Sequence, residues 1–149
     1  MELGPQQLQE RMKRFADEIR RAGAKVTHQR MEIFREVAQT GDHPDADTVY
    51  TRVRQRIPTI SLDTVYRTLW LLRDLSLITT LGPAREKVRF DANTSPHHHF
   101  VCTRCGAARD VHAERLDQIE VPDAVKELGA VERTHVQFRG ACFRCSTED

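Results

Sequence analysis

Four cysteines in two Cys-x-x-Cys pairs are the residues of this chain best suited to chemistry. The pairs are Cys102 with Cys105 and Cys142 with Cys145, and they include every cysteine of the 149-residue sequence. Four thiolates satisfy the tetrahedral preference of Zn²⁺, and the short gap lets one turn present two sulfurs to one ion. Two disulfides are the alternative, but such closely spaced pairs make poor staples and the chain shows no secretory context. The spacing therefore predicts a structural zinc site.

Three consecutive histidines, His97, His98 and His99, lie shortly before the first cysteine pair. If this segment is a strand, His97 and His99 point to one side and His98 to the other. Two imidazoles on one side are half of a metal site, although a single histidine is more often an ordinary packed or surface residue. Asp91 and Asp110 offer oxygen ligands. Imidazole with carboxylate suits Fe²⁺, Mn²⁺ or Zn²⁺, so the sequence predicts a second site with a harder ligand set.

The elements that hold these residues begin with four helical patterns. Apolar side chains recur at helical spacing in residues 6–21 and 28–38, and a short helix before Pro58 follows. Thr27 and Ser61 are placed to cap the second and fourth helices. Asp45 or Asp47 is placed to cap the third. The fourth helix carries one apolar stripe, made of Leu62, Val65, Leu69 and Leu72.

A hairpin and a second domain complete the predicted fold. Extended runs at residues 77–81 and 87–90 flank Gly82 and Pro83, which indicates a hairpin. Helices followed by a hairpin are the order of a winged helix-turn-helix. Turn-forming residues at 91–96 suggest a hinge. Strands near residues 99–102 and 107–111, a helical stretch broken by Pro122, and a strand at 131–138 follow. The predicted fold is α+β, with a winged-helix domain at 1–91 and a small α/β domain at 92–149.

The fourth helix is either a DNA reader or a surface helix. Thr64, Tyr66 and Arg67 carry groups that can reach base edges or phosphates. Lys25 and Arg30 near the second helix could contact the DNA backbone or a minor groove, although each taken singly is often a solvated charge. Residues 1–91 hold 16 basic against 13 acidic side chains (+3), and residues 92–149 hold 7 against 9 (−2). This asymmetry permits nucleic-acid binding without demonstrating it.

The sequence contains no apolar run long enough to span a bilayer and no signal-like start. We therefore expect a soluble, cytoplasmic protein without membrane contact. In that compartment thiols stay reduced and available to zinc.

Together these segments resemble the ferric uptake regulator (Fur) family of repressors. The likeness covers nearly the whole chain, and spacing and order agree. It includes THQR at 27–30, HPDADTVY at 43–50, ISLDTVYRTL at 60–69, RFD at 89–91, HHHFVCTRCG at 97–106 and CFRC at 142–145.

The resemblance implies roles for these residues. The four cysteines correspond to the structural zinc site that supports a dimerisation domain. A regulatory Fe²⁺ or Mn²⁺ site corresponds to His43, Asp91, His97, His99 and Asp110, taken from both domains. Bound metal would hold the domains closed, so that the two recognition helices of a homodimer meet successive major grooves about 34 Å apart. Lys25 matches a minor-groove lysine, and Tyr66 and Arg67 match the recognition-helix pair.

Aspartate at both positions 91 and 110 resembles the peroxide-sensing PerR branch, because iron sensors usually carry glutamate at one or both. Short ligands can leave Fe²⁺ with an open face for H₂O₂. Family behaviour implies that His97 or His43 then becomes 2-oxo-histidine, metal is lost and repression ends. An iron-uptake or zinc-uptake repressor that reads metal level is the alternative.

The chain departs from the family pattern at an additional metal site. Thr134 stands where many members carry a histidine, His135 is one residue late, and Pro96 and His98 replace other usual ligands. We therefore expect this third site to be absent or altered. We expect His28, His112 and His135 to be ordinary residues without a role in metal binding.

An enzyme is the remaining alternative, since non-haem iron oxygenases also use two histidines and a carboxylate. The sequence offers no segment for a substrate pocket, and the polar face of the fourth helix would have no role. A bare zinc-ribbon module would leave the histidines and aspartates unexplained. The sequence predicts a repressor that binds a double-stranded operator, and not an enzyme.

Overall fold

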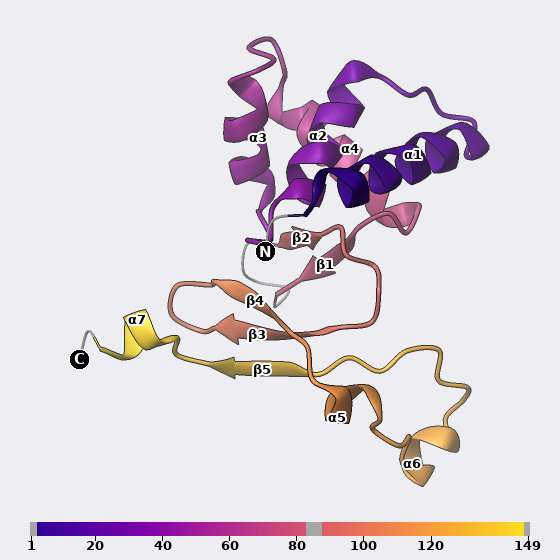
Figure 1. Cartoon of the computed structure of the whole chain (residues 1–149), viewed down its shortest axis with the longest axis vertical. Coiled ribbons are helices and arrows are strands. Elements are labelled where there is room, and N and C mark those ends of the chain that lie inside the picture. The colour runs from indigo at the N-terminus through magenta and orange to yellow at the C-terminus, as the bar shows by residue number, and fades with distance from the viewer. Residues whose placement is uncertain (1–2, 83–87, 148–149) are drawn as a thin grey trace. The chain divides into compact units, whose positions relative to one another are not determined.

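Four helices occupy the first part of the chain among the residues that the structure describes (Figure 1). They are α1 (Pro5–Arg21), α2 (His28–Gln39), α3 (Ala46–Arg54) and α4 (Leu62–Asp74). Thr27, Asp45 and Ser61 each accept a hydrogen bond from the backbone N–H three residues on. These caps satisfy N–H groups that have no partner within the helix. The caps predicted for α2 and α4 are confirmed, and Asp45 is the cap of α3.

The computed structural model describes residues 3–82 and 88–147 and divides into two compact units, residues 1–94 and 95–149. They are called the N-terminal and C-terminal units below. No helix in the described part of the chain combines the length and apolar character needed to cross a membrane.

The core of the N-terminal unit joins all four helices. Phe15 of α1 stacks on Phe34 of α2 with ring centroids 4.9 Å apart. From α4, three predicted residues of the stripe are fully buried: Val65, Leu69 and Leu72. Leu62 was predicted to join them but is 37% exposed, whereas Thr68 is buried. Side chains lean toward the N-terminus of their helix. The side chain of Leu62, the first residue of α4, therefore extends past the packed face.

The predicted hairpin is present as β1 (Thr79–Leu81) and β2 (Arg89–Asp91), which pair antiparallel with Thr80 opposite Phe90. Phe90 is buried, and its ring meets that of Trp70 edge-on at 5.9 Å. This hairpin of β1 and β2, called the wing below, is thereby packed against α4. Pro83 and Lys87, which belonged to the predicted hairpin, lie outside the described residues.

Three strands form the sheet of the C-terminal unit. They are β3 (His98–Cys102), β4 (Ala108–Val111) and β5 (Gln137–Gly140), in the order β4-β3-β5. β4 pairs antiparallel to β3 and β5 parallel to it. The one-turn helices are α5 (Glu114–Asp117), α6 (Asp123–Lys126) and α7 (Phe143–Ser146).

The predicted α+β class is confirmed, but two predictions for the C-terminal unit were inaccurate. The strand expected at 131–138 begins only at Gln137, because pairing with β3 starts there. The expected helical stretch is reduced to α5 and α6. Pro122 stands at the N-cap of α6, where its missing N–H costs no helical hydrogen bond.

Leu69→Ala should lower the free energy of unfolding of the N-terminal unit by about 2–5 kcal/mol, because it leaves a cavity in the core. Leu62→Ala makes the same chemical change in the same helix and should cost about 1 kcal/mol or less. Urea unfolding followed by fluorescence of Trp70, the sole tryptophan, compares them. Equal losses would show that α4 packs differently.

Candidate functional site

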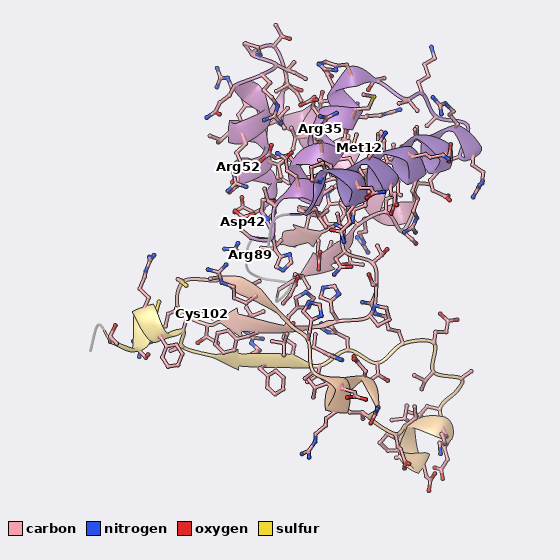
Figure 2. The ribbon with its side chains drawn as sticks, viewed as in Figure 1. Met12, Arg35, Asp42, Arg52, Arg89 and Cys102 are labelled. Atoms are coloured by element: carbon pink, nitrogen blue, oxygen red, sulfur yellow. The ribbon has the colours of Figure 1, made fainter. Side chains whose placement is uncertain are left out.

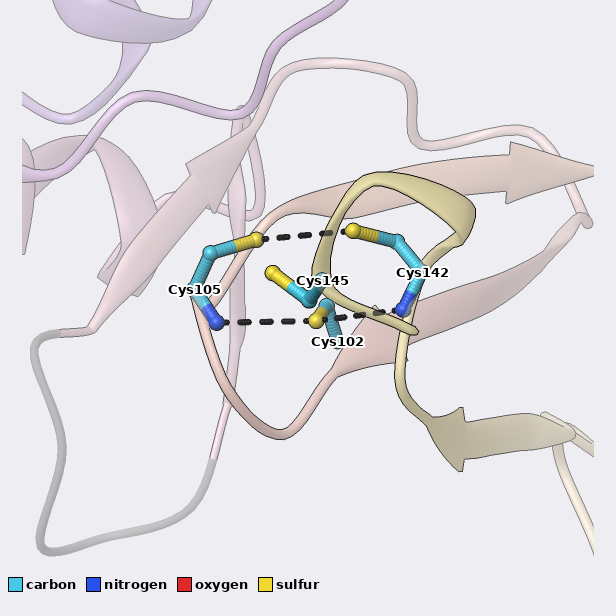
Figure 3. Close-up of side chains that lie close together, drawn as sticks. All are labelled: Cys102, Cys105, Cys142 and Cys145. Atoms are coloured by element: carbon cyan, nitrogen blue, oxygen red, sulfur yellow. Dashed lines mark hydrogen bonds between the residues drawn. The ribbon is translucent and has the colours of Figure 1, made fainter. Parts of the chain in front are cut away.

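The sulfur atoms of the four cysteines all lie within 4.8 Å of one another (Figure 3). Cys102 ends β3, Cys105 follows it in a turn, and Cys142 and Cys145 stand at the start of α7 and within it. All four are free thiols, so the disulfide alternative is not adopted. Zn–S bonds of about 2.3 Å in a tetrahedron require sulfurs about 3.8 Å apart. Cys105 Sγ and Cys142 Sγ are 3.9 Å apart, and the cluster fits a structural zinc ion.

Backbone N–H groups prepare this cluster for a cation. The N–H groups of Cys105 and Cys142 donate to Cys102 Sγ at 3.5 and 3.3 Å. These bonds lower the pKa of Cys102 to about 6, which favours the thiolate that zinc requires. The thiol of Cys142 and burial raise the pKa of Cys145 to about 12. Arg104 Nη1 also donates to the Cys145 carbonyl at 2.7 Å, so the two cysteine turns are joined directly.

Two of the predicted regulatory ligands meet in the N-terminal unit. His43 lies in the loop between α2 and α3, and Asp91 ends β2. His43 Nδ1 is 3.7 Å from Asp91 Oδ1, and both side chains are buried. The backbone N–H of Asn93 donates to the same Asp91 oxygen at 2.8 Å, which fixes the carboxylate. The pair offers one imidazole and one carboxylate.

The other three predicted ligands meet in the C-terminal unit. His99 stands opposite Asp110 in the pairing of β3 with β4. The Nε2 atoms of His97 and His99 lie 3.4 and 3.3 Å from Asp110 Oδ1. His97 Nδ1 is 2.7 Å from the Ser95 carbonyl, which can only accept, so Nδ1 carries the proton and Nε2 keeps its lone pair. The predicted placement of His97 and His99 on one side is confirmed.

His98 points to the other side of β3 and is fully engaged. Its Nδ1 accepts from the N–H of Val136 at 3.0 Å. The proton must therefore be on Nε2, which lies 2.9 Å from Asp117 Oδ1. His98 ties β3 to the segment before β5 and to α5, which is a structural role.

His135 was assigned no role from the sequence, but it contacts a predicted ligand. Its Nε2 lies 2.7 Å from His99 Nδ1. Burial, with the neighbouring charge of His99, lowers the pKa of His135. The neutral imidazole can then accept the Nδ1 proton of His99, leaving Nε2 of His99 for a metal. The absence or alteration of the third site remains a prediction.

Four of the five predicted DNA contacts surround one depression in the N-terminal unit. It has a volume of about 460 Å³, and its polar lining includes Lys25, Thr27, Arg30, Thr64 and Arg67. Arg30 Nη1 donates to the Lys25 carbonyl at 2.7 Å. Arg67 is 81% exposed and pairs with Asp63 of its own helix at 3.0 Å. Tyr66, 40% exposed, lies outside this lining. Three cations around one depression suit a phosphate.

The chain belongs to the ferric uptake regulator family, whose sequence profile matches residues 21–139. The peroxide-responsive repressor PerR of Staphylococcus epidermidis is 32% identical over 132 residues, 87% of each chain. PerR of Staphylococcus aureus strain USA300 is 31% identical over 129 residues, 85% of this chain and 86% of the relative.

Solved structures share the fold. The Helicobacter pylori ferric uptake regulator Fur, described with three functional metal-binding sites, superposes with a TM-score of 0.79 at 22% identity, covering 98% of this chain and 97% of its own. The Vibrio cholerae regulator gives 0.69 at 28% identity, covering 85% of this chain and 98% of its own.

Cys142→Ser should lose zinc and unfold the C-terminal unit, because structural zinc contributes folding free energy on the order of 10 kcal/mol. Elemental analysis gives the zinc content, and hydrogen exchange of the β3 amides reports the fold. Ser146→Ala is the control, since Ser146 lies in the same one-turn helix and its hydroxyl donates to the Phe143 carbonyl at 3.0 Å, away from the sulfurs. A zinc-free Cys142→Ser protein with protected β3 amides would contradict the structural role.

Proposed function

We propose that this protein is a homodimeric repressor that binds its operator when a regulatory metal is present and releases it after oxidation by peroxide. The observation that carries the proposal is the pair of half-sites, His43 with Asp91 in one unit and His97, His99 and Asp110 in the other. Three imidazoles and two carboxylates suit Fe²⁺ or Mn²⁺. The family resemblance implies that one ion takes ligands from both units, which would couple metal binding to operator affinity.

The peroxide response is supported by the aspartates at both carboxylate positions and by the peroxide-responsive relatives. Fe²⁺, when bound, would activate H₂O₂ toward transfer of one oxygen atom to an imidazole; the imidazole supplies the two electrons, and the second oxygen atom leaves as water. His43 and His97 hold their imidazoles in the site, and we expect one of them to gain an oxygen atom. An oxidised imidazole is a poorer ligand, so the metal would be lost and the operator would be released.

DNA recognition is assigned to α4 and the depression beside it. Thr64, Tyr66 and Arg67 lie toward the N-terminal end of α4, the part of a recognition helix that contacts base edges. Lys25 and Arg30 line the depression and would bind the phosphate backbone or an adjacent minor groove.

Dimerisation is assigned to the C-terminal unit. Among described residues, six of the nine exposed large apolar side chains belong to it: Ile119, Val125, Leu128, Val131, Phe138 and Phe143. Leu128 is 87% exposed and Phe143 92%. β5 is also an edge strand of the sheet. Exposed apolar side chains and an unpaired strand edge each favour burial against a second copy.

Arg67→Ala should weaken operator binding by about 1–3 kcal/mol and relax specificity at one base pair, if Arg67 forms a bidentate contact with guanine. The Mn²⁺-loaded protein is titrated against DNA selected from a random pool, and then against single-base variants. Arg20→Ala is the control, because Arg20 is likewise exposed and near an acidic residue of its own helix. Equal loss on every sequence would instead indicate a phosphate contact.

Peroxide should add one oxygen atom to the His43 or His97 peptide of the Fe²⁺-loaded protein and release DNA. Mass spectrometry of the peptides and DNA anisotropy measure both effects. The Mn²⁺-loaded protein and the His28 peptide, which lies in α2, are the controls and should stay unchanged. DNA release by peroxide without this mass gain would refute histidine oxidation, and release only by chelation would favour a sensor of metal level.

A further inference from the structure

Two neighbouring residues of β2 hold the loop that carries His43. Arg89 Nη1 donates to the carbonyls of Asp42 at 3.3 Å and His43 at 3.2 Å. The backbone N–H of Phe90 donates to the Pro44 carbonyl at 3.0 Å. Three successive carbonyls of the loop are therefore bound by residues 89 and 90, and the next residue of β2 is Asp91.

The backbone of His43 needs such support. Its φ is +49°, in the left-handed region that side chains other than glycine seldom adopt. A residue keeps this conformation only where its surroundings hold it. The hydrogen bond from Arg89 acts on the carbonyl of His43 itself.

The opposite side of the loop is also fixed. The carboxylate of Asp42 accepts two hydrogen bonds from Arg52 of α3, at 2.6 and 3.4 Å. Figure 2 shows Arg52, Asp42 and Arg89 following one another between α3 and β2. The loop is thus held by two arginines, one through a side chain and one through main-chain carbonyls. Of these two arginines, Arg89 is the one that donates to the backbone of the predicted ligand His43.

We propose that Arg89 is a positioning residue of the regulatory metal site, which orients the His43 imidazole toward Asp91 before metal binds. This inference rests on the proposed ligand set. Hydrogen bonds that orient a ligand raise metal affinity because less order must be imposed on binding. Without Arg89 the loop could leave the left-handed conformation, and metal binding would have to restore it.

A double-mutant cycle tests the proposal in the full-length, zinc-loaded protein. Mn²⁺ affinity is measured by electron paramagnetic resonance of the free ion for wild type, Arg89→Ala, His43→Ala and the double variant. Arg89→Ala should weaken binding roughly 10- to 100-fold, as loss of an orienting group does. In the His43→Ala background it should cause no further loss. Arg109→Ala removes an exposed arginine beside the ligand Asp110 and should leave affinity unchanged.

The outcomes separate this inference from the proposed function. Equal weakening by Arg89→Ala in both backgrounds, or none in either, overturns the positioning role while His43 remains a ligand. Unchanged affinity in His43→Ala overturns the ligand set and the inference with it. Zinc content and Trp70 fluorescence confirm that each variant is folded. If Arg89→Ala does not fold, Arg89→Met, which keeps the apolar stem but no donor, replaces it in the cycle.

Discussion

Few apolar side chains are buried in the C-terminal unit. Among described residues they are Val101, Cys102, Ala108 and Cys145, and two of these belong to the cysteine cluster. Three short strands and one-turn helices with so small a core do not hold together by apolar packing. The unit therefore depends on the four cysteine sulfurs and on the zinc ion that they would coordinate together. The fold that places the exposed apolar side chains and the histidines therefore needs this zinc site.

Strand β3 connects that zinc site to the candidate regulatory ligands. Cys102 is its last residue, and His98 and His99 are its first two. Because side chains alternate along the strand, His99 points toward Asp110, and His98 points to the opposite side, where it accepts a hydrogen bond from the N–H of Val136. Fixing one end of a short paired strand limits rotation at the other. The sulfur cluster and the imidazoles of His98 and His99 are thus two parts of one strand, so the zinc site steadies the backbone that carries a proposed regulatory ligand.

Local patterns made much of this structure predictable. Caps such as Ser61 and the cysteine spacing act over a few residues, so their types suffice, and strand alternation was enough to place His97 with His99. Leu62 was misassigned because periodicity does not register the end of a helix. The contacts of Arg89 with His43 and of His135 with His99 join residues 46 and 36 positions apart. No residue pattern marks such contacts, because they depend on how separate strands and loops pack.

The N-terminal unit shows why holding the ligand loop matters for a metal-controlled repressor. Arg52 of α3 pairs with Asp42 in the loop and with Glu36 of α2, at 2.6 and 3.7 Å. With Arg89 on the other side, the loop joins α2, α3 and the wing into one piece. If the loop were flexible, a metal bound to His43 would order only the loop, and its binding free energy would not be coupled to the helices. Because hydrogen bonds and ion pairs fix the loop on both sides, metal binding at His43 would also constrain α2 and α3, the helices that pack against α4.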